Sequence, residues 1–312
     1  MRNAFINQLF SFAQKDRNVI LMSGDLGFGV LDKFRNELPG QYFNAGICEQ
    51  NMASMAAGLA MEGKKVYLYS IGNFPTLRCI EQIRNDICYH NADVKIISVG
   101  GGFAYGALGM SHHATEDIAM MRSLPQMEVY APCDPAEAAE TAKTVYAIHS
   151  PCYIRLNKGG EPILILHDGK SELPHYDIRK MNRVVNGDSA CIIATGAILG
   201  EAIKAAKFLK TEGISTAVYS LARIKPVEKE DVISKSKKYS LVVTLEEHNL
   251  SAGFGSAIAE IFAEVPGMPP MIRLGMKDEY TAFVGSQEYI RKAYGLDGAS
   301  VAAVIAGYYK KG

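Results

Sequence analysis

Residues 65–101 read KVYLYSIGNFPTLRCIEQIRNDICYHNADVKIISVGG, and this stretch decides the fold class. Two short runs rich in β-branched and aromatic residues, 65–71 and 94–101, have the composition of buried strands. Between them, residues 76–90 have apolar side chains at helical spacing. A strand, a helix and a second strand in this order predict a βαβ unit and therefore a parallel sheet.

The same alternation continues on both sides of that stretch. The segment 134–149 has a clear helix start, with Asp134 as the N-cap, Pro135 at the first helical position and Glu137 in capping-box register. We therefore expect several βαβ units in the N-terminal half. Further strands are expected at 19–24, 127–132 and 152–157, and further helices at 49–63 and 116–124.

A second α/β pattern follows a break in periodicity. Glycine, proline and charged residues interrupt the pattern across 161–187, and strand and helix signals restart at 188. We therefore predict an α/β protein of two domains with parallel or mixed sheets, at 1–160 and, smaller, at 188–312, with a linker at 161–187. The second domain has expected strands at 189–196, 215–221 and 240–248 and expected helices at 201–213, 228–238 and 256–265.

Composition excludes several classes of protein. Of 312 residues, 48% are hydrophobic, and 33 Lys and Arg balance 33 Asp and Glu. No global field therefore attracts nucleic acid or an anionic membrane, although a local cluster can still bind a small anionic substrate. No run approaches 18 apolar residues, and the N-terminus lacks a continuous apolar secretion signal. We expect a soluble, cytoplasmic protein without disulfides or a zinc site, because its cysteines are scattered: Cys48, Cys79, Cys88, Cys133, Cys152 and Cys191.

The segment FNAGICEQNMASMAAGLA at 43–60 is the most informative for function. Taken alone, Glu49 is a first-turn carboxylate that the helix dipole favours. The whole ordered string resembles the segment that transketolases and related enzymes place against the aminopyrimidine of thiamin diphosphate. The resemblance implies that Glu49 is a catalytic and cofactor-binding residue, because its carboxyl group would hydrogen-bond to pyrimidine N1′. That bond favours the imino tautomer, which removes the C2 proton of the thiazolium ring.

Three further residues match cofactor positions in transketolases. Phe74 follows one expected strand, where the family offers an aromatic ring to the aminopyrimidine, although a core Phe fits the same place. Arg78 and Gln82 share a helical face by their i, i+4 spacing. Three interpretations of this face remain: it lines the cofactor pocket, it belongs to a subunit interface, or it is a salt-bridged surface. Asp25 matches an acidic position near the thiazolium ring.

The segment 101–138 begins with a Gly-rich loop, GGFAYGALGMSHH, and resembles the substrate loop of transketolases and deoxyxylulose-phosphate synthases. In that register His112 matches the family histidine that contacts substrate oxygens, and His113 is a second substrate-binding candidate. Leu108 stands where family members carry an Asp that recognises a donor hydroxyl. Because Leu cannot accept a hydrogen bond, the stereochemistry or chain length of the preferred ketose is open.

Two cationic residues match family positions that bind a sugar phosphate. These are Arg2 and Lys158, both at positions that usually hold Arg, although each is also an ordinary surface charge. Lys carries a single-point charge, whereas the guanidinium group of Arg can form two parallel hydrogen bonds to a phosphate, so Lys158 is the weaker match.

The resemblance also covers the C-terminal domain, as in VVTLEEHNLSAGFGSAIAE at 242–260. No catalytic group is expected there. Glu246, Glu247 and His248 are adjacent, so a strand would point them to alternating faces, and a structural use is favoured over a metal site.

One family motif is absent from the sequence. Thiamin-diphosphate enzymes bind the diphosphate through Mg²⁺ with a Gly-Asp-Gly turn, and this chain has no Gly-Asp-Gly. We therefore expect no metal ligands in this chain. The resemblance implies a pyrimidine-binding domain followed by a transketolase C-terminal domain, with Mg²⁺ ligands on a separate N-terminal subunit in an α₂β₂ heterotetramer.

The resemblance predicts transfer of a two-carbon ketol unit from a ketose, as a sugar phosphate, to an aldose through thiamin diphosphate. Three alternatives remain open at this point. They are the β subunit of a 2-oxo-acid dehydrogenase, a specialised relative acting on an unusual sugar, and a noncatalytic paralogue that only binds the partner subunit.

Overall fold

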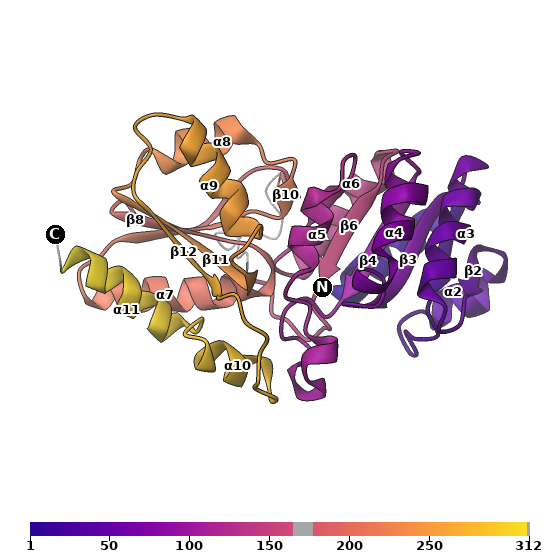
Figure 1. Ribbon diagram of the computed structural model, residues 1–312, viewed down its shortest axis with the longest axis horizontal. Helices are drawn as coiled ribbons and strands as arrows, with labels where there is room; N and C mark the ends of the chain where they lie inside the picture. Colours follow the sequence, from indigo (N-terminus) through magenta and orange to yellow (C-terminus); the bar gives the residue numbers. More distant parts are fainter. Residues whose placement is uncertain (165–176, 311–312) are drawn as a thin grey trace.

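The computed structural model describes residues 1–164 and 177–310, and within them the chain forms two α/β units side by side (Figure 1). The first unit is built on a seven-stranded sheet of order β10-β5-β6-β4-β3-β1-β2. At its centre β3 (Lys65–Ile71) pairs in parallel with β4 (Val94–Val99), as residues 65–101 predicted. The α/β fold class is thereby confirmed.

Only the edge strand β10 runs antiparallel in this sheet, against β5. All the other strand pairs of this sheet are parallel, so the carboxyl ends of those strands lie at one edge of the sheet. The remaining strands of the sheet are β1 (Val19–Ser23), β2 (Tyr42–Asn44), β5 (Glu128–Tyr130), β6 (Cys152–Leu156) and β10 (Arg223–Lys225).

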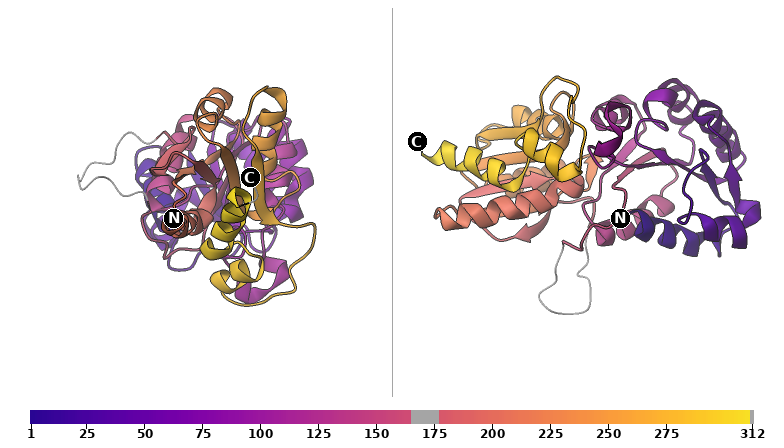
Figure 2. Two further views of the ribbon diagram at one scale, coloured as in Figure 1. Left: turned by 90° about the vertical axis from the view of Figure 1, so that its left-hand side faces the viewer. Right: turned by 90° about the horizontal axis from the view of Figure 1, so that it is seen from below.

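Helices cover both faces of the first sheet (Figure 2). One face packs against α1 (Arg2–Ala13), α2 (Asp32–Glu37) and α6 (Pro135–Ala147). The other packs against α3 (Glu49–Met61), α4 (Ile80–Gln82) and α5 (Asp117–Ser123). Helix α6 begins as the sequence predicted, because the Asp134 carboxylate accepts a hydrogen bond from the Glu137 N–H at 2.8 Å.

The helix expected at 76–90 is irregular. It consists of a 3₁₀ turn, η2 (Leu77–Cys79), the short α4 and a π-helical segment, η3 (Ile83–Cys88). An expectation of regular α-helix over this range is therefore wrong, and i, i+4 spacing does not describe where its side chains point. Wide turns of this kind are frequent near functional sites.

The second unit has a five-stranded sheet of order β12-β11-β8-β9-β7, in which β7 is antiparallel to β9. Helices α7 (Leu199–Thr211) and α11 (Gly298–Tyr309) pack on one face, and α8 (Lys229–Ser236) and α9 (Phe254–Glu264) lie over the other. Helix α10 (Gln287–Ala293) faces the first unit (Figure 1). The strands are β7 (Asn182–Val185), β8 (Ala190–Ala194), β9 (Thr216–Ser220), β11 (Leu241–Asn249) and β12 (Met271–Met276).

The two units are not separated as cleanly as the sequence suggested. Strand β7 lies inside the range 161–187 that was expected to be a linker, and β10 comes from the C-terminal half but joins the first sheet. One buried apolar cluster also runs through both units. Part of the expected linker, 165–176, lies outside the described residues, and the division at 160 and 188 stays a prediction.

Two properties of the chain bear on its environment. None of the described helices is both long and apolar enough to cross a membrane. All six cysteines lie in described ranges and are free; Cys48 is exposed and the others are buried. Burial raises the pKa of Cys79 to about 12, which keeps this thiol protonated at neutral pH.

Candidate active site

Glu49 begins α3 at the carboxyl end of the sheet and is only 2% exposed. Gly46 sets the turn before it with a φ of +67°, a conformation that favours glycine. One carboxylate oxygen, Oε2, accepts a hydrogen bond from Arg78 Nη1 at 2.6 Å. Burial and the ion pair with Arg78 make Glu49 a fixed, largely dehydrated carboxyl group.

Gly24 lies next to both the Glu49 carboxylate and the Ser70 hydroxyl. A Cβ at Gly24 would come within 3.5 Å of Glu49 Oε1 and 3.4 Å of Ser70 Oγ. Ser70 Oγ is buried and has no hydrogen-bond partner among the described residues. A carboxylate oxygen and an unsatisfied hydroxyl therefore lie beside the same glycine, a pairing that suits a ligand with hydrogen-bonding ring atoms.

Arg78 connects Glu49 to Phe74. Its guanidinium carbon lies 4.9 Å from the centre of the half-buried Phe74 ring, within the range of a cation–π contact. Arg78 points to Glu49 and forms an ion pair with it, and the choice between the three interpretations of this helical face stays open. Gln82 does not share that contact, since its Nε2 donates to Glu81 Oε2 at 3.3 Å.

His112 lies on the other side of Phe74. The two ring centres are 5.3 Å apart and the rings meet edge to face. His112 ends the 3₁₀ turn η5 (Met110–His112) and is half-buried, with Nδ1 3.0 Å from Ser111 Oγ. The structure thus brings Glu49, Phe74, Arg78 and His112 together at the ends of parallel strands, where ligands of open α/β sheets bind.

His113 points away from this group. It is 2% exposed, its ring meets Phe103 edge to face at 5.6 Å, and its Nε2 lies 3.2 Å from the Gly106 carbonyl oxygen. Burial lowers the pKa of His113, which keeps the ring neutral. This side chain packs inside the chain and leaves almost no surface for a substrate to contact, and substrate binding by His113 stays a prediction.

Asp25 is placed at the rim of the site. Its φ is +56°, and its Oδ1 accepts a hydrogen bond from Asn44 Nδ2 at 2.8 Å. Asn44 Oδ1 in turn accepts from the N–H groups of Asp25 at 3.1 Å and Gly46 at 2.9 Å. Asn44 therefore ties Asp25 to the turn that leads into Glu49.

Arg2 and Lys158 come together beside Tyr105, although they are far apart in the sequence. The Lys158 Nζ atom lies 6.0 Å from the centre of the Tyr105 ring. Burial raises the pKa of the Tyr105 hydroxyl, and a hydrogen bond from Arg2 partly offsets this rise. A Cβ at Gly159 would meet Arg2 Nη2 at 3.9 Å. Both cations therefore lie close to Tyr105.

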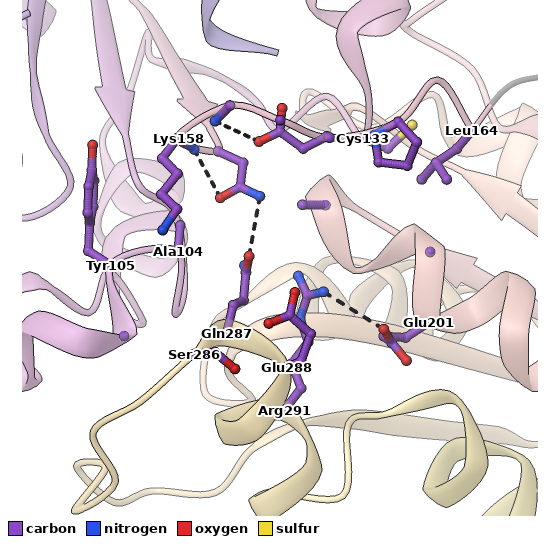
Figure 3. A pocket seen from close by; sticks show the side chains of 18 of the residues that line it. Ala104, Tyr105, Cys133, Lys158, Leu164, Glu201, Ser286, Gln287, Glu288 and Arg291 are labelled. Atoms are coloured by element: carbon purple, nitrogen blue, oxygen red, sulfur yellow. Dashed lines mark hydrogen bonds and ion pairs between the residues drawn. The ribbon is translucent and has the colours of Figure 1, made fainter.

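A cavity of about 740 Å³ opens next to this pair, between the two units (Figure 3). Leu108, at the end of the 3₁₀ turn η4 (Gly106–Leu108), and Lys158 line its wall in the first unit. Gln287 and Arg291 of α10 line the opposite wall. Leu108 is 55% exposed, so an apolar side chain is accessible at this wall of the cavity.

Three contributors to this region were not singled out from the sequence. Ser70 could have been noticed as a polar residue near the end of an apolar strand, and Tyr105 as an aromatic residue in a Gly-rich loop. Asn44 gives no such signal, because its role depends on the partner strand. The sequence does not identify these three residues, because their roles depend on side chains that are close to them only in the folded chain.

The Glu246–His248 segment is part of the protein core. Glu246 accepts hydrogen bonds from the N–H groups of Phe254 and Gly255, which start α9. Burial raises the pKa of Glu246 to about 7 and lowers that of His248 to about 4. Within residues 1–164 and 177–310, no group of three or more His, Cys, Asp or Glu residues is placed to hold a metal ion.

Comparison with known proteins gives consistent matches over both units. Residues 1–161 match the family model described as transketolase, pyrimidine binding domain, and residues 179–301 match transketolase, C-terminal domain. A putative transketolase C-terminal section from Methanocaldococcus jannaschii is 36% identical over 312 residues, covering 100% of this chain and 96% of the relative. An apulose-4-phosphate transketolase subunit from Phocaeicola vulgatus is 32% identical over 311 residues, covering 99% of this chain and 97% of the relative.

A solved structure is also similar. It is described as a split-gene transketolase in an inactive β4 tetramer, and it superposes with a TM-score of 0.84 at 32% identity. The match covers 98% of this chain and 96% of that chain. The likeness therefore extends over both α/β units.

Proposed function

The chain belongs to the transketolase family, as a section with the pyrimidine-binding and C-terminal domains, and from this premise we propose that it is the C-terminal subunit of a two-subunit transketolase. The complex transfers a two-carbon ketol unit from a ketose phosphate to an aldose. The observation that carries this proposal is the buried Glu49 carboxylate, which is ion-paired with Arg78 and lies in one group with Phe74 and His112.

The residues present fit the aminopyrimidine end of thiamin diphosphate. When bound, this cofactor supplies a nucleophilic carbon that stabilises negative charge on the carbonyl carbon of the donor. Glu49 holds a proton at pyrimidine N1′, and Arg78 fixes the other carboxylate oxygen. Phe74 offers its ring face, and the unsatisfied Ser70 hydroxyl provides a further hydrogen bond. Asp25 contributes negative charge at the rim.

The diphosphate and Mg²⁺ are held by a partner in this proposal. The chain lacks the Gly-Asp-Gly motif, and several large apolar side chains in or near the segments that carry Glu49 and Arg78 are exposed. Exposed apolar patches of this kind mark protein interfaces. We assign this surface to contact with an N-terminal transketolase subunit, in an α₂β₂ heterotetramer. We place the complex in the cytoplasm, because free cysteines stay reduced there. The most exposed of these side chains are Phe28, Phe43, Ile47, Met55 and Leu77.

His112 contacts the oxygens next to the reacting carbon, and Arg2 with Lys158 holds the donor phosphate. Their placement supports these roles, because His112 lies beside Phe74 while the two cations lie beside Tyr105. A phosphate held by two cations gains charge-assisted hydrogen bonds from both.

Replacing Lys158 tests the phosphate site. Lys158→Met should raise KM for phosphorylated ketoses about 10- to 150-fold, because a hydrogen bond to a charged group contributes roughly 1.5–3 kcal/mol. KM for an unphosphorylated ketose should stay unchanged, and Lys158→Arg should restore binding of the phosphorylated donor. Steady-state kinetics of the reconstituted complex measures all three.

Lys207→Met is the matched control, because Lys207 lines the same cavity from α7. An equal effect of both substitutions, or an effect of Lys158→Met on both kinds of donor, would remove Lys158 from phosphate recognition.

The donor preference is tested through Leu108. Without a hydrogen-bond acceptor there, the pocket should discriminate weakly for the hydroxyl configuration that an Asp would recognise, or should favour a donor with an apolar group at that place. Leu108→Asp should improve kcat/KM for the usual configuration about 5- to 150-fold, since an unsatisfied buried hydroxyl costs roughly 1–3 kcal/mol. Met110→Asp adds the same charge two residues away and serves as the control.

A screen of ketose phosphates, unusual ketoses and 2-oxo acids with the reconstituted complex decides between the remaining functions. The apolar Leu108 favours a specialised sugar over a common one, and the similarity to an apulose-4-phosphate transketolase subunit agrees with this. Turnover of 2-oxo acids alone would favour a 2-oxo-acid dehydrogenase subunit. No turnover of any donor with a verified partner would indicate a noncatalytic paralogue.

A further inference from the structure

Glu247 of β11 reaches from the second unit into the first. It is 3% exposed, and its Oε1 accepts a hydrogen bond from the backbone N–H of Phe103 at 2.5 Å. Phe103 starts the loop 103–113, which carries Leu108 and His112. The side chain of a residue in the C-terminal half thus holds the beginning of the substrate loop.

The position of the Glu247 carboxylate is itself fixed. Its Oε1 also accepts from Gln287 Nε2 at 2.8 Å, and its Oε2 pairs with the Arg291 guanidinium. Both partners belong to α10, so the second unit presents Glu247 to the loop in one orientation. The loop is shaped to receive it: Gly102 has a φ of +61°, and a Cβ there would lie 2.3 Å from Glu247 Oε1.

The other end of the loop is held by the same pair of units. Arg155 Nη2 donates to the carbonyl oxygens of Ala114 at 2.7 Å and Glu247 at 2.9 Å. The N–H of Asn249, in β11, donates to the Thr115 carbonyl oxygen at 2.8 Å. Backbone hydrogen bonds between Gly102 and Ala114 then close the base of the loop.

We propose that Glu247 is a positioning residue for ketol transfer, which sets the place of the loop bearing His112 and Leu108 from the C-terminal domain. It contacts neither substrate nor cofactor in this role. The inference rests on the proposed function, and it gives the C-terminal domain a part in the reaction through contact with the loop.

Glu246 provides a matched control because it is the adjacent residue and is equally buried. Its carboxylate caps α9 inside the second unit, through Phe254 N–H at 2.6 Å and Gly255 N–H at 2.8 Å. Replacing either Glu removes a buried carboxylate from the same strand. Of the two, only Glu247 contacts the start of the substrate loop, so we expect only its replacement to loosen that loop.

The kinetic test compares Glu247→Ala and Glu246→Ala in the complex reconstituted with the N-terminal subunit. We expect kcat/KM for the ketose donor to fall about 100-fold in Glu247→Ala, since displacing positioning groups by roughly 1 Å has that effect. Exchange of the cofactor C2 hydrogen, which depends on Glu49, should stay within about twofold of wild type. Glu247→Gln keeps an acceptor for Phe103 N–H and should recover part of the activity.

Glu246→Ala should lower the melting temperature without this selective loss of donor turnover. Equal losses in both variants, or parallel losses of C2 exchange and ketol transfer, would show that Glu247 acts only through stability and would overturn the proposal.

Hydrogen–deuterium exchange of the chain alone tests the same contact without any activity. Amides of residues 103–113 should exchange faster in Glu247→Ala but not in Glu246→Ala, where faster exchange should appear at the start of α9. Unchanged protection of the loop in Glu247→Ala contradicts the positioning role while leaving the transketolase function intact. If the loop loses protection in Glu247→Ala but the wild-type complex turns over no ketose, the proposed function is contradicted while the contact between Glu247 and the loop is supported.

Discussion

Glu49→Gln should reduce ketol transfer by the reconstituted complex about 10²- to 10⁴-fold, the range for loss of a group that handles a proton. The amide has nearly the shape of the carboxyl group, but it cannot hold a proton at N1′. Exchange of the cofactor C2 hydrogen should fall by a similar factor, because it precedes contact with the donor. Both quantities can be measured on the same preparation, by coupled assay and by NMR.

Glu62→Gln is the control for this experiment. Glu62 follows the other end of the same helix, α3, and is exposed. It should leave turnover, C2 exchange and assembly unchanged. Wild-type exchange in Glu49→Gln would exclude Glu49 from cofactor activation, whereas loss of assembly would assign it to the interface.

The second large effect concerns the partner. Without the N-terminal subunit, the chain should show no ketol transfer and should bind thiamin diphosphate with Mg²⁺ at least about 100-fold more weakly than the complex, a difference of about 2.8 kcal/mol. The reason is that no Gly-Asp-Gly segment is present to hold the metal and the diphosphate. Isothermal titration calorimetry of each subunit and of the complex gives the comparison.

Titration of the chain with thiamin, which has no diphosphate, shows how much the pyrimidine and the diphosphate each contribute to the binding affinity. If the chain supplies the pyrimidine site alone, removing the diphosphate should change its affinity little. Tight stoichiometric binding of thiamin diphosphate by the chain alone would contradict the split-enzyme proposal.

The sequence predicted Glu49, Phe74, Arg78 and His112 as site residues through their resemblance to transketolase segments, and parallel-sheet geometry explains why some of them lie together. Phe74 and His112 follow the expected strands 65–71 and 94–101, and the carboxyl ends of parallel strands meet at one edge. The short strand before Glu49, β2, was not expected from the sequence. The pairing of Arg78 with Glu49 was not predictable, since it depends on the irregular turns of 77–88.

The two neighbouring histidines show where sequence reasoning stops. His112 and His113 have the same side chain in the same loop, but only the contacts of His113 with Phe103 and Gly106 decide which ring is buried. The sequence also did not predict the short edge strands, for a related reason. Strands β7 and β10 are four and three residues long, too short to show a period, and their partners lie far away in the sequence.

Strand alternation was informative for Glu246 and Glu247. It predicted that the two carboxylates point to opposite faces, and in the structure Glu246 caps α9 within the second unit, whereas Glu247 contacts α10 and also reaches Phe103 of the first unit. It gave no indication that one of them reaches the substrate loop, because that contact depends on how the two units pack.

The crossing of β10 into the first sheet makes the two halves depend on one another for folding. A fragment that ends before residue 223 would leave β5 as the open edge of the sheet, with unpaired backbone groups that invite aggregation. The shared apolar cluster would lose one side as well. The chain is therefore expected to unfold as one cooperative body, and a gene division that keeps both products stable is better placed outside this pair of domains than between them.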